Sequence, residues 1–388
     1  MTFRLPGLAK RILMAAFYST LGATFVLLVV FVLYLNSRTD LDIWHTADLD
    51  EEFTQDSEVD DLEEYLDLEQ RLFEQLDRLV YDRIPPAQHT AINRYHRDSL
   101  SDPQRWEQDW NRSYELSSSS PRGAVLLLHG MSDSPYSLRK LGQSLHAEGF
   151  DVLGLRLPGH GTAPSGLLEV TWQDMAAATR LAMQHLADKN PGLPIYIMGY
   201  STGAALAVHY ALLVQENESL PPVERMVLIS PAIGVSPVAA FAVWQARLGH
   251  LLGLDKLSWN DLLPEYDPFK YGSFAVNAGD VVYRLTNQIQ ERITVLERED
   301  KLQNLPQILA FSSIVDATVS TPALVSGLFE RLPANGHELV LFDVNRVEGI
   351  EPLMKRNPDE IIREIKHNLC RSGRIEVKVN LARHAQGF

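Results

Sequence analysis

Residues 194–208 read Pro194-Ile-Tyr-Ile-Met-Gly-Tyr-Ser-Thr-Gly-Ala-Ala-Leu-Ala-Val208. A short apolar run leads into Gly199-Tyr-Ser201-Thr-Gly203, and small residues typical of a helix follow. The pattern G-x-S-x-G between a strand and a helix predicts a tight, strained turn that lifts the serine hydroxyl above the sheet, at the amino end of the helix. This context favours Ser201 as a nucleophile over a serine in an ordinary turn.

Apolar runs of strand length alternate with longer amphipathic runs on both sides of this motif. We expect strands over residues 124–129, 151–155, 194–198, 225–229, 307–311 and 338–342, and helices over 173–188, 201–214 and 321–332. This alternation predicts an α/β fold, a mostly parallel sheet with helices on both faces. A polar, turn-rich stretch precedes the first strand, so the main domain is expected to span residues 117–388.

Two further strand ends are rich in glycine. His129-Gly130-Met131-Ser132 follows the first expected strand, where an acyl-transfer enzyme needs a backbone N–H directed at a developing oxyanion. The N–H groups of Met131 and Thr202 are our candidates for an oxyanion hole, and a plain turn is the alternative. Pro158-Gly-His-Gly161 ends the next strand, and we interpret His160 as structural rather than catalytic.

These motifs resemble a known superfamily. His129-Gly130, Pro158-Gly-His-Gly161, Gly199-Tyr-Ser-Thr-Gly203 and Val315-Asp-Ala-Thr-Val319, in this order, look like the α/β hydrolases, near their monoacylglycerol-lipase and serine-aminopeptidase-like branch. The resemblance covers residues 123–344. Five more stretches are similar to a group of bacterial, N-terminally anchored α/β hydrolases with poorly defined substrates: Trp44–Phe53, Tyr136–Arg139, Ser230–Gly234, Pro264–Tyr271 and Leu341–Arg346.

The resemblance implies a catalytic triad in the chain order Ser, Asp, His. Asp316 ends the late strand region 309–316 and is the expected triad acid; an aspartate that merely caps a loop is the alternative, and Asp343 is the reserve candidate. In this fold the acid orients the imidazole and stabilises it when it is charged.

The triad histidine has no clear candidate. The loop at 343–352 contains none, His337 precedes its strand, and His367 lies in an expected helix over 359–369. His384 follows another possible strand at 374–380 and is the stand-in. In closely similar proteins the base lies in a Ser-Leu-Ser-His segment without a counterpart here, so one hypothesis is that this chain ends before its family's histidine.

Residues Ile12–Leu35 form an uncharged, apolar run of 24 residues. At ~1.5 Å per residue such a helix reaches ~36 Å and crosses a ~30 Å hydrocarbon core. We expect an uncleaved transmembrane helix; a cleaved signal peptide is the alternative. Basic residues predominate before the run, which predicts a cytoplasmic N-terminus and an extracytoplasmic hydrolase domain, periplasmic in a Gram-negative cell.

The net charge is 35 − 50 = −15, and it is concentrated in one segment. Between Asp40 and Asp77 sixteen acids accompany one base, so nucleic acid is not an expected partner. Residues 36–116 are therefore expected to form an acidic helical segment. Its apolar stripe, interrupted by Glu69, predicts a helix that packs on the following domain, or alternatively a coiled-coil stalk.

Residues 237–304 contain many aromatic and aliphatic side chains between two expected strands. Such an insertion is typical of a cap over the site that suits an acyl chain, although the same residues could simply pack the cap on the core. No HExxH or Walker pattern is present, and the one cysteine, Cys370, cannot form a disulfide within the chain. No metal or cofactor is therefore expected.

The expected function is a membrane-anchored serine hydrolase that cleaves a carboxylic ester. The substrate is expected to be a lipid such as a monoacylglycerol or a lysophospholipid. Two alternatives remain: a catalytically impaired hydrolase fold used as a binding protein, and an amidase or peptidase, which would share every motif.

Overall fold

The computed structural model describes residues 7–234, 254–314, 321–342, 363 and 375–380. The chain divides into two compact units, residues 1–42 and residues 43–388.

The first unit consists of the helix α1, Gly7–Ser37. Its part from Arg11 to Ser37 is 27 residues long, the mean hydropathy reaches 2.2 over an 18-residue window, and nearly all of its side chains are exposed. It is the one helix of the described residues that is long and apolar enough to cross a membrane. A signal sequence near an N-terminus also passes this test of length and composition.

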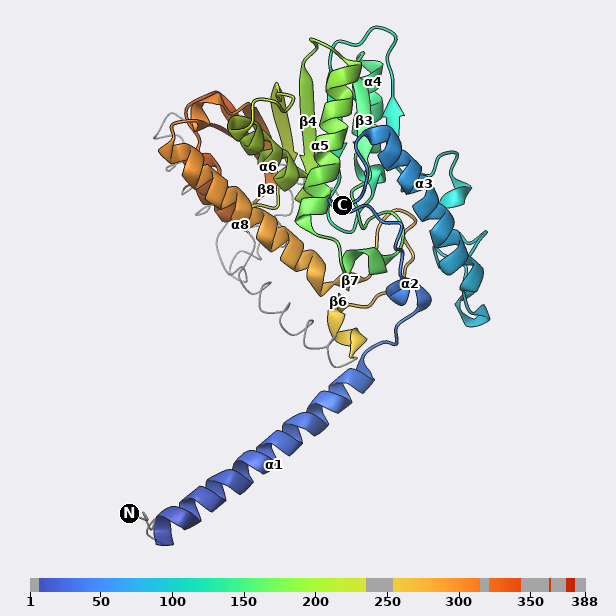
Figure 1. The fold of residues 1–388 in the computed structure, drawn as a ribbon, viewed down its shortest axis with the longest axis vertical. Helices are drawn as coiled ribbons and strands as arrows, with labels where there is room; N and C mark the ends of the chain where they lie inside the picture. Colours follow the sequence, from blue (N-terminus) through green and yellow to red (C-terminus); the bar gives the residue numbers. More distant parts are fainter. Residues whose placement is uncertain (1–6, 235–253, 315–320, 343–362, 364–374, 381–388) are drawn as a thin grey trace, which may run out of the picture. The chain divides into compact units, whose positions relative to one another are not determined.

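The second unit is built on an eight-stranded sheet (Figure 1). Its strands are β1 Tyr114–Leu116, β2 Ala124–Leu128, β3 Asp151–Leu155, β4 Ile195–Tyr200, β5 Arg225–Ile229, β8 Gln307–Ser313, β9 His337–Phe342 and β10 Ile375–Asn380. Their order across the sheet is β1-β3-β2-β4-β5-β8-β9-β10, and every neighbouring pair is parallel except β1 with β3. The expected α/β fold with a mostly parallel sheet is confirmed.

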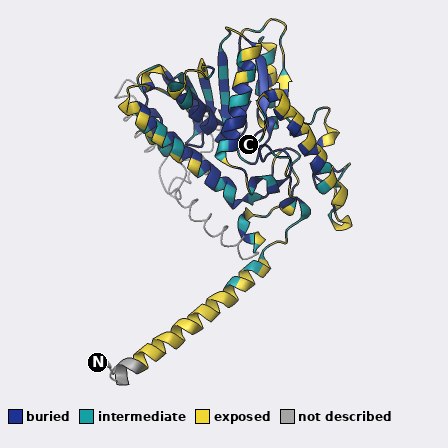
Figure 2. Ribbon diagram, viewed as in Figure 1, coloured by how far each residue is buried: buried dark blue, intermediate teal, exposed yellow. Residues whose placement is uncertain are grey.

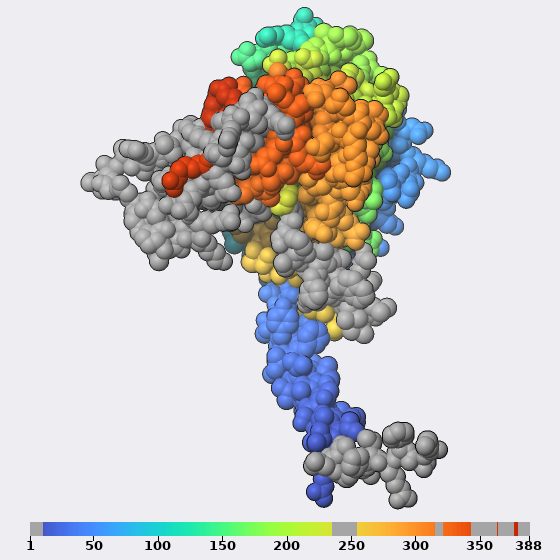
Figure 3. Space-filling view, turned by 90° about the vertical axis from the view of Figure 1, so that its left-hand side faces the viewer, coloured from blue at the N-terminus to red at the C-terminus, as the bar shows by residue number. Residues whose placement is uncertain are grey.

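Helices cover both faces of this sheet. They are α4 Arg139–Ala147, α5 Trp172–Lys189, α6 Thr202–Glu216, α8 Val276–Arg298 and α9 Thr321–Gly327, and a 3-10 turn Phe329–Arg331 follows α9. The helices α5, α6 and α8 pack on one another, and residues around α8 form part of the surface in orange (Figures 1 and 3). The expected helix 321–332 is thus shorter, and α4 and α8 are additional to those expected.

The alternation of side chains along the strands produces two apolar layers. Val125 and Leu127 face the layer that contains Leu138 and Leu145, beside α4. Leu126, which points to the opposite face, is fully buried under the layer of α5 and α6. Figure 2 shows the strands as the most buried part of the unit.

Smaller elements surround the carboxyl edge of the sheet. They are α2 Ile43–Thr46, the short antiparallel pair β6 Trp259–Asp261 and β7 Phe274–Ala275, and the 3-10 turns Tyr81–Arg83, Pro86–Gln88, Pro103–Arg105, Pro135–Leu138, Pro164–Leu167 and Asp255–Ser258. A further 3-10 turn, Leu302–Asn304, leads into the amino end of β8. Of the range 237–304, residues 237–253 lie outside the described part.

The acidic segment forms α3, Leu62–Leu79, which begins at the N-cap Asp61. The Asp61 carboxylate accepts the Glu64 N–H at 2.9 Å and so satisfies one of the free donors of the first turn. The helix buries its apolar side, and it contacts α5. Because β1 then pairs with β3, the segment belongs to the same compact unit as the sheet.

Candidate active site

Ser201 lies between β4 and α6 in a strained conformation, with φ 53° and ψ −112°. A positive φ is unfavourable for a residue with a Cβ, so its surroundings must hold it there. The Ser201 N–H donates to the Ile229 carbonyl at 2.9 Å, and its own carbonyl accepts the N–H groups of Ala204, Ala205 and Ala232 at 3.0–3.2 Å. These hydrogen bonds fix the turn against β5 and the first turn of α6.

The two glycines of the motif allow a very close approach of backbone segments. A Cβ on Gly199 would lie 2.4 Å from the Ala204 nitrogen, and one on Gly203 would lie 2.1 Å from the Leu128 carbonyl oxygen and 2.6 Å from that of His129. No other residue fits either position without a shift of the backbone. The amino end of α6 therefore lies directly against the carboxyl end of β2.

Two backbone N–H groups beside Ser201 have no acceptor. Within the described residues, neither the Met131 N–H nor the Thr202 N–H makes a hydrogen bond. Thr202 is the first residue of α6, where the helix dipole contributes positive potential. The side chain of Met131 packs on Ala232, whose N–H donates to the Ser201 carbonyl. Both amides are thus available to an anion.

His129 is buried and is not placed to act as a base. Its Nε2 accepts the Leu157 N–H at 3.0 Å, so its proton lies on Nδ1, which donates to the Gly130 carbonyl at 2.9 Å. Burial and the neighbouring His160 hold the pKa of His129 well below its ordinary value. A neutral ring with both nitrogens occupied can orient the backbone, but it cannot accept a proton from Ser201.

A buried guanidinium stands at the exit of β3. Arg156, which is 1% exposed, donates from Nη2 and Nη1 to the two carboxylate oxygens of Glu52 at 2.9 and 3.0 Å. Its Nε donates to Glu69 at 3.1 Å. Burial disfavours the charged form, but the two carboxylates raise the pKa of Arg156 above its ordinary value. The ion pairs join the acidic segment to this strand end.

Tyr271 connects the two glycine-rich loops. Its N–H donates to the Ser132 carbonyl at 2.9 Å. Its hydroxyl donates to the Gly159 carbonyl at 3.2 Å and accepts the Thr162 N–H at 2.9 Å. The loop after β2 and the loop after β3 are therefore held by one residue from the stretch before β7.

Some of the remaining expected site residues lie within the described part of the chain, and others lie outside it. Asp316 and His384 lie outside the described residues, as do Asp343, the reserve candidate for the acid, and His367 of the expected helix 359–369. His337 starts β9 at the amino edge of the sheet, opposite Ser201, and accepts the Ile308 N–H at 3.2 Å. Burial lowers the pKa of His337 to about 4.

Among the described residues no histidine hydrogen-bonds the Ser201 hydroxyl, and no group of three or more His, Cys, Asp or Glu could hold a metal. Thr202 directly follows Ser201, and Met131 packs on Ala232, which binds the Ser201 carbonyl. The roles of these residues, like those of the triad acid and base, stay predictions.

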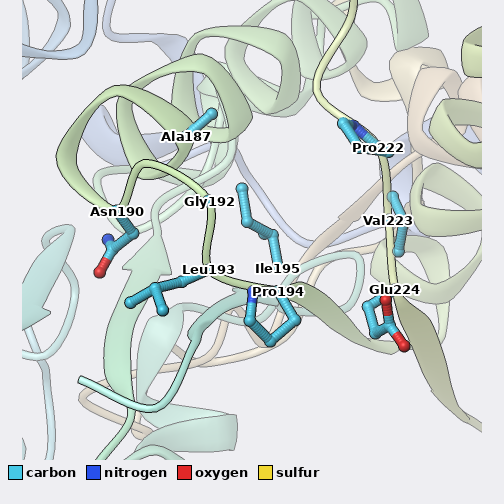
Figure 4. Close-up of a pocket in the computed structure, with 9 residues that line it drawn as sticks. All are labelled: Ala187, Asn190, Gly192, Leu193, Pro194, Ile195, Pro222, Val223 and Glu224. Carbon is cyan, nitrogen blue, oxygen red and sulfur yellow. The ribbon is translucent and has the colours of Figure 1, made fainter.

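A surface pocket of about 460 Å³ lies elsewhere (Figure 4). It is formed where the chain enters β4 and β5, at the amino edge of the sheet. Its lining residues are Ala187, Asn190, Gly192, Leu193, Pro194, Ile195, Pro222, Val223 and Glu224. Because Ser201 follows the carboxyl end of β4, this pocket is not part of the candidate site.

The comparison with known families agrees with this geometry. The sequence profile described as "Serine aminopeptidase, S33" matches residues 119–343, more than half of the chain. The chain belongs to the serine aminopeptidase S33 family of hydrolases.

Part of the chain is similar in sequence to a lipase. A thermostable monoacylglycerol lipase from Bacillus sp. (strain H-257) is 30% identical over 116 residues, which is 30% of this chain and 43% of that enzyme. The match thus spans less than half the length of the curated relative.

Two solved structures were matched at lower identity. The Paleococcus ferrophilus monoacylglycerol lipase has a TM-score of 0.45 at 19% identity, and a metagenome-derived lipolytic enzyme has 0.46 at 19%. Each comparison covers 66% of this chain and 98% of the other.

Several residues that shape the site of this S33 family member were not predicted from the sequence. Glu52 and Tyr271 lie in stretches that resemble the anchored hydrolases, but no local pattern assigns a role to them or to Arg156, and the ordering role of His129 depends on a partner 28 residues away. One signal was present: Glu69 interrupts the apolar stripe of α3, and a buried carboxylate requires a buried cation or several donors.

Proposed function

We propose that the protein is a membrane-anchored serine hydrolase that cleaves a carboxylic ester of a lipid such as a monoacylglycerol or a lysophospholipid. The name of the Bacillus relative supports this substrate class over the matched 116 residues. The apolar helix α1 supports the anchor, and the excess of basic residues before it supports a cytoplasmic N-terminus. The hydrolase domain would then act outside the cytoplasm.

One observation carries the proposal of chemistry at Ser201. The strained turn places this serine directly before Thr202 and, through Ala232, close to Met131, and neither N–H of these two residues has an acceptor within the described part of the chain. Acyl transfer requires a nucleophile and oxyanion-binding N–H groups that reach the same carbonyl group of the substrate. A structural turn would need neither the strain nor two unused donors.

The proposed reaction has two halves. The Ser201 Oγ attacks the ester carbonyl while a histidine, with His384 as the candidate, takes its proton and Asp316 orients that ring. The Met131 and Thr202 amides stabilise the tetrahedral oxyanion. Collapse breaks the C–O bond, the histidine protonates the leaving alcohol, and water then releases the acid from the acyl-enzyme in the same way.

The test is labelling of the full chain, in detergent, with a fluorophosphonate that reacts with activated serines. We expect labelling of the wild type and of Ser219→Ala, an exposed-serine control, and no labelling of Ser201→Ala. The labelled protein should also hydrolyse a monoacylglycerol. An unlabelled wild type would overturn the proposal and favour a binding protein, because no described histidine contacts the Ser201 hydroxyl.

An amidase or peptidase is the second candidate, since the family is described as a serine aminopeptidase. The two functions differ in the bond that is cleaved and not in the nucleophile. Matched 4-nitrophenyl esters and amino-acid 4-nitroanilides separate them: turnover of the anilide at a rate comparable to the ester would replace the ester proposal.

A further inference from the structure

The acidic segment reaches the neighbourhood of Ser201 through one buried ion-pair cluster. The Arg156 guanidinium binds Glu52 through two hydrogen bonds and Glu69 through a third. The side chains are 1%, 16% and 4% exposed, respectively. Paired hydrogen bonds between a guanidinium and a carboxylate fix orientation as well as distance. The position of Arg156 is therefore set by residues about 90 to 100 positions earlier in the chain.

The same cluster holds the loop that follows β3. Arg156 Nη1 donates to the His160 carbonyl at 3.0 Å, and Glu52 Oε2 accepts the Gly159 N–H at 2.8 Å. The loop is thus hydrogen-bonded by both members of the ion pair. The Glu52 carboxylate binds both Arg156 and the loop backbone. The Glu69 carboxylate binds Arg156 and accepts hydrogen bonds from the Ser113 N–H and hydroxyl, but none from the loop.

From this loop the contacts continue to the candidate oxyanion hole. The Leu157 N–H donates to His129 Nε2, which places the ring proton on Nδ1, and Nδ1 donates to the Gly130 carbonyl. This carbonyl and the Met131 N–H belong to one trans peptide, because the described chain contains no cis bond. In a trans peptide the two groups point in opposite directions. The Gly130 carbonyl also accepts the Asp133 N–H at 3.2 Å, so His129 is one of two groups that set its direction, and with it the direction of the Met131 N–H.

We propose that Glu52 is a positioning residue for the oxyanion hole, acting through Arg156, the loop after β3 and His129 on the Met131 amide. The acidic segment would then support catalysis in addition to folding. The inference rests on the proposed function, since it assumes that the Met131 amide binds an oxyanion.

The first experiment compares Glu52→Gln with Glu51→Gln in the full chain. Both remove one negative charge from neighbouring positions, but Glu51 pairs with the exposed Arg71 and has no contact with the loop. Glutamine at 52 retains one acceptor, and Arg156 retains Glu69, so the fold should persist. Active sites are counted by fluorophosphonate labelling, and kcat per labelled site and KM are measured with a short-chain 4-nitrophenyl ester.

We expect Glu52→Gln to lower kcat per labelled site about tenfold with KM unchanged, and to weaken a boronic acid inhibitor by a similar factor. Loss of an oxyanion donor costs about 10²- to 10³-fold, and a misplaced donor should cost less. Glu51→Gln should match the wild type. A loss confined to the number of labelled sites, or to the unfolding temperature, would show a purely structural role and overturn the inference.

A second measurement does not depend on activity. In protein labelled with ¹⁵N-methionine, the Met131 amide signal, assigned with Met131→Leu, should shift in Glu52→Gln and remain in place in Glu51→Gln. An unchanged signal in both variants would overturn the inference even if the wild type is active. If the signal shifts but the wild type neither labels nor turns over ester, the proposed function fails while the connection from Glu52 to Met131 stands.

Discussion

The turn at Ser201 and the loop at His129 lie side by side, but they are held in different ways. In the turn, backbone groups determine the geometry: the Ser201 carbonyl accepts N–H groups of α6 and of Ala232, and the Ser201 N–H donates to Ile229 of β5. In the loop, the Gly130 carbonyl accepts from the His129 ring, which also binds the Leu157 N–H, and from the Asp133 N–H at 3.2 Å. The turn is therefore held by backbone groups, whereas the loop depends in addition on a buried side chain.

This difference predicts which substitutions affect one region and spare the other. A steric change in the turn should disturb Ser201 while most of the fold remains. A change in the buried charges should weaken the whole unit as well as the loop, because the ion pairs join the acidic segment to the sheet.

The largest effect is expected for Arg156→Met. The substitution leaves the Glu52 and Glu69 carboxylates without their cation, and breaking a buried pair in this way costs about 3–5 kcal/mol. Urea unfolding of the full chain measures the change. Adding Glu52→Gln and Glu69→Gln to Arg156→Met should recover part of the loss. A decrease below about 1 kcal/mol would contradict a central role for the cluster.

The next effect concerns the turn. In Gly203→Ala the new methyl carbon would lie 2.1 Å from the Leu128 carbonyl oxygen, so the turn must shift, at a cost of about 1–3 kcal/mol. We expect fluorophosphonate labelling to be lost while the chain still unfolds cooperatively. The control is Gly327→Ala in α9, where the methyl meets the end of the Gln290 side chain at 3.1 Å and the Ile233 side chain at an ordinary contact distance of 3.6 Å. Normal labelling of Gly203→Ala would refute the steric explanation.

A smaller effect links stability to pH. Burial lowers the pKa of His160 to about 4 and that of His209, in the interior of α6, to about 3. In the unfolded chain both titrate near 6.5, so between pH 6.5 and 4 the unfolded state binds protons that the folded state does not, and stability falls as pH falls.

The variant His209→Leu removes one of the two side chains that bind a proton in the unfolded state but not in the folded state between pH 6.5 and 4. The slope of unfolding free energy against pH in this window should decrease by about 1.4 kcal/mol per pH unit. Urea titrations at pH 6.5, 5.5 and 4.5 determine it. A slope identical to that of the wild type would mean that His209 is protonated in the folded protein.

The smallest effect is expected for an exposed pair of the same acidic segment. Arg71 and Glu51 are 53% and 38% exposed, and their ion pair of 3.1 Å is typical of contacts that contribute about 0–1 kcal/mol. Arg71→Ala should therefore unfold almost as the wild type does, with unchanged labelling. A loss as large as that in Arg156→Met would show that surface charge, and not burial, stabilises this segment.

The contrast also explains what the sequence could predict. Strand positions such as 124–128 and 225–229 follow from local apolar runs, and G-x-S-x-G predicted the strained turn that the structure shows at Ser201. The α/β fold follows from the same local patterns. The helix α8 lies within residues 237–304, the range expected to form a helical cap, but its bounds do not follow from a local pattern.

Contacts between remote residues are invisible to such patterns. Glu52 and Arg156 are 104 positions apart, and no local rule joins them. The tautomer of His129 likewise depends on the Leu157 N–H, which only the folded chain brings near. The roles of Asp316 and His384 stay predictions, since both lie outside the described residues.

The strand β1 affects how a smaller hydrolase could be prepared from this chain. The family profile begins at residue 119, after β1, and a protein cut there would lose the strand that pairs with β3. The cut would leave the apolar stretch Val152–Leu155 as an open sheet edge, and such edges pair with other chains. It would also remove both carboxylates that bind Arg156. A soluble protein for biophysical work should therefore begin near residue 43.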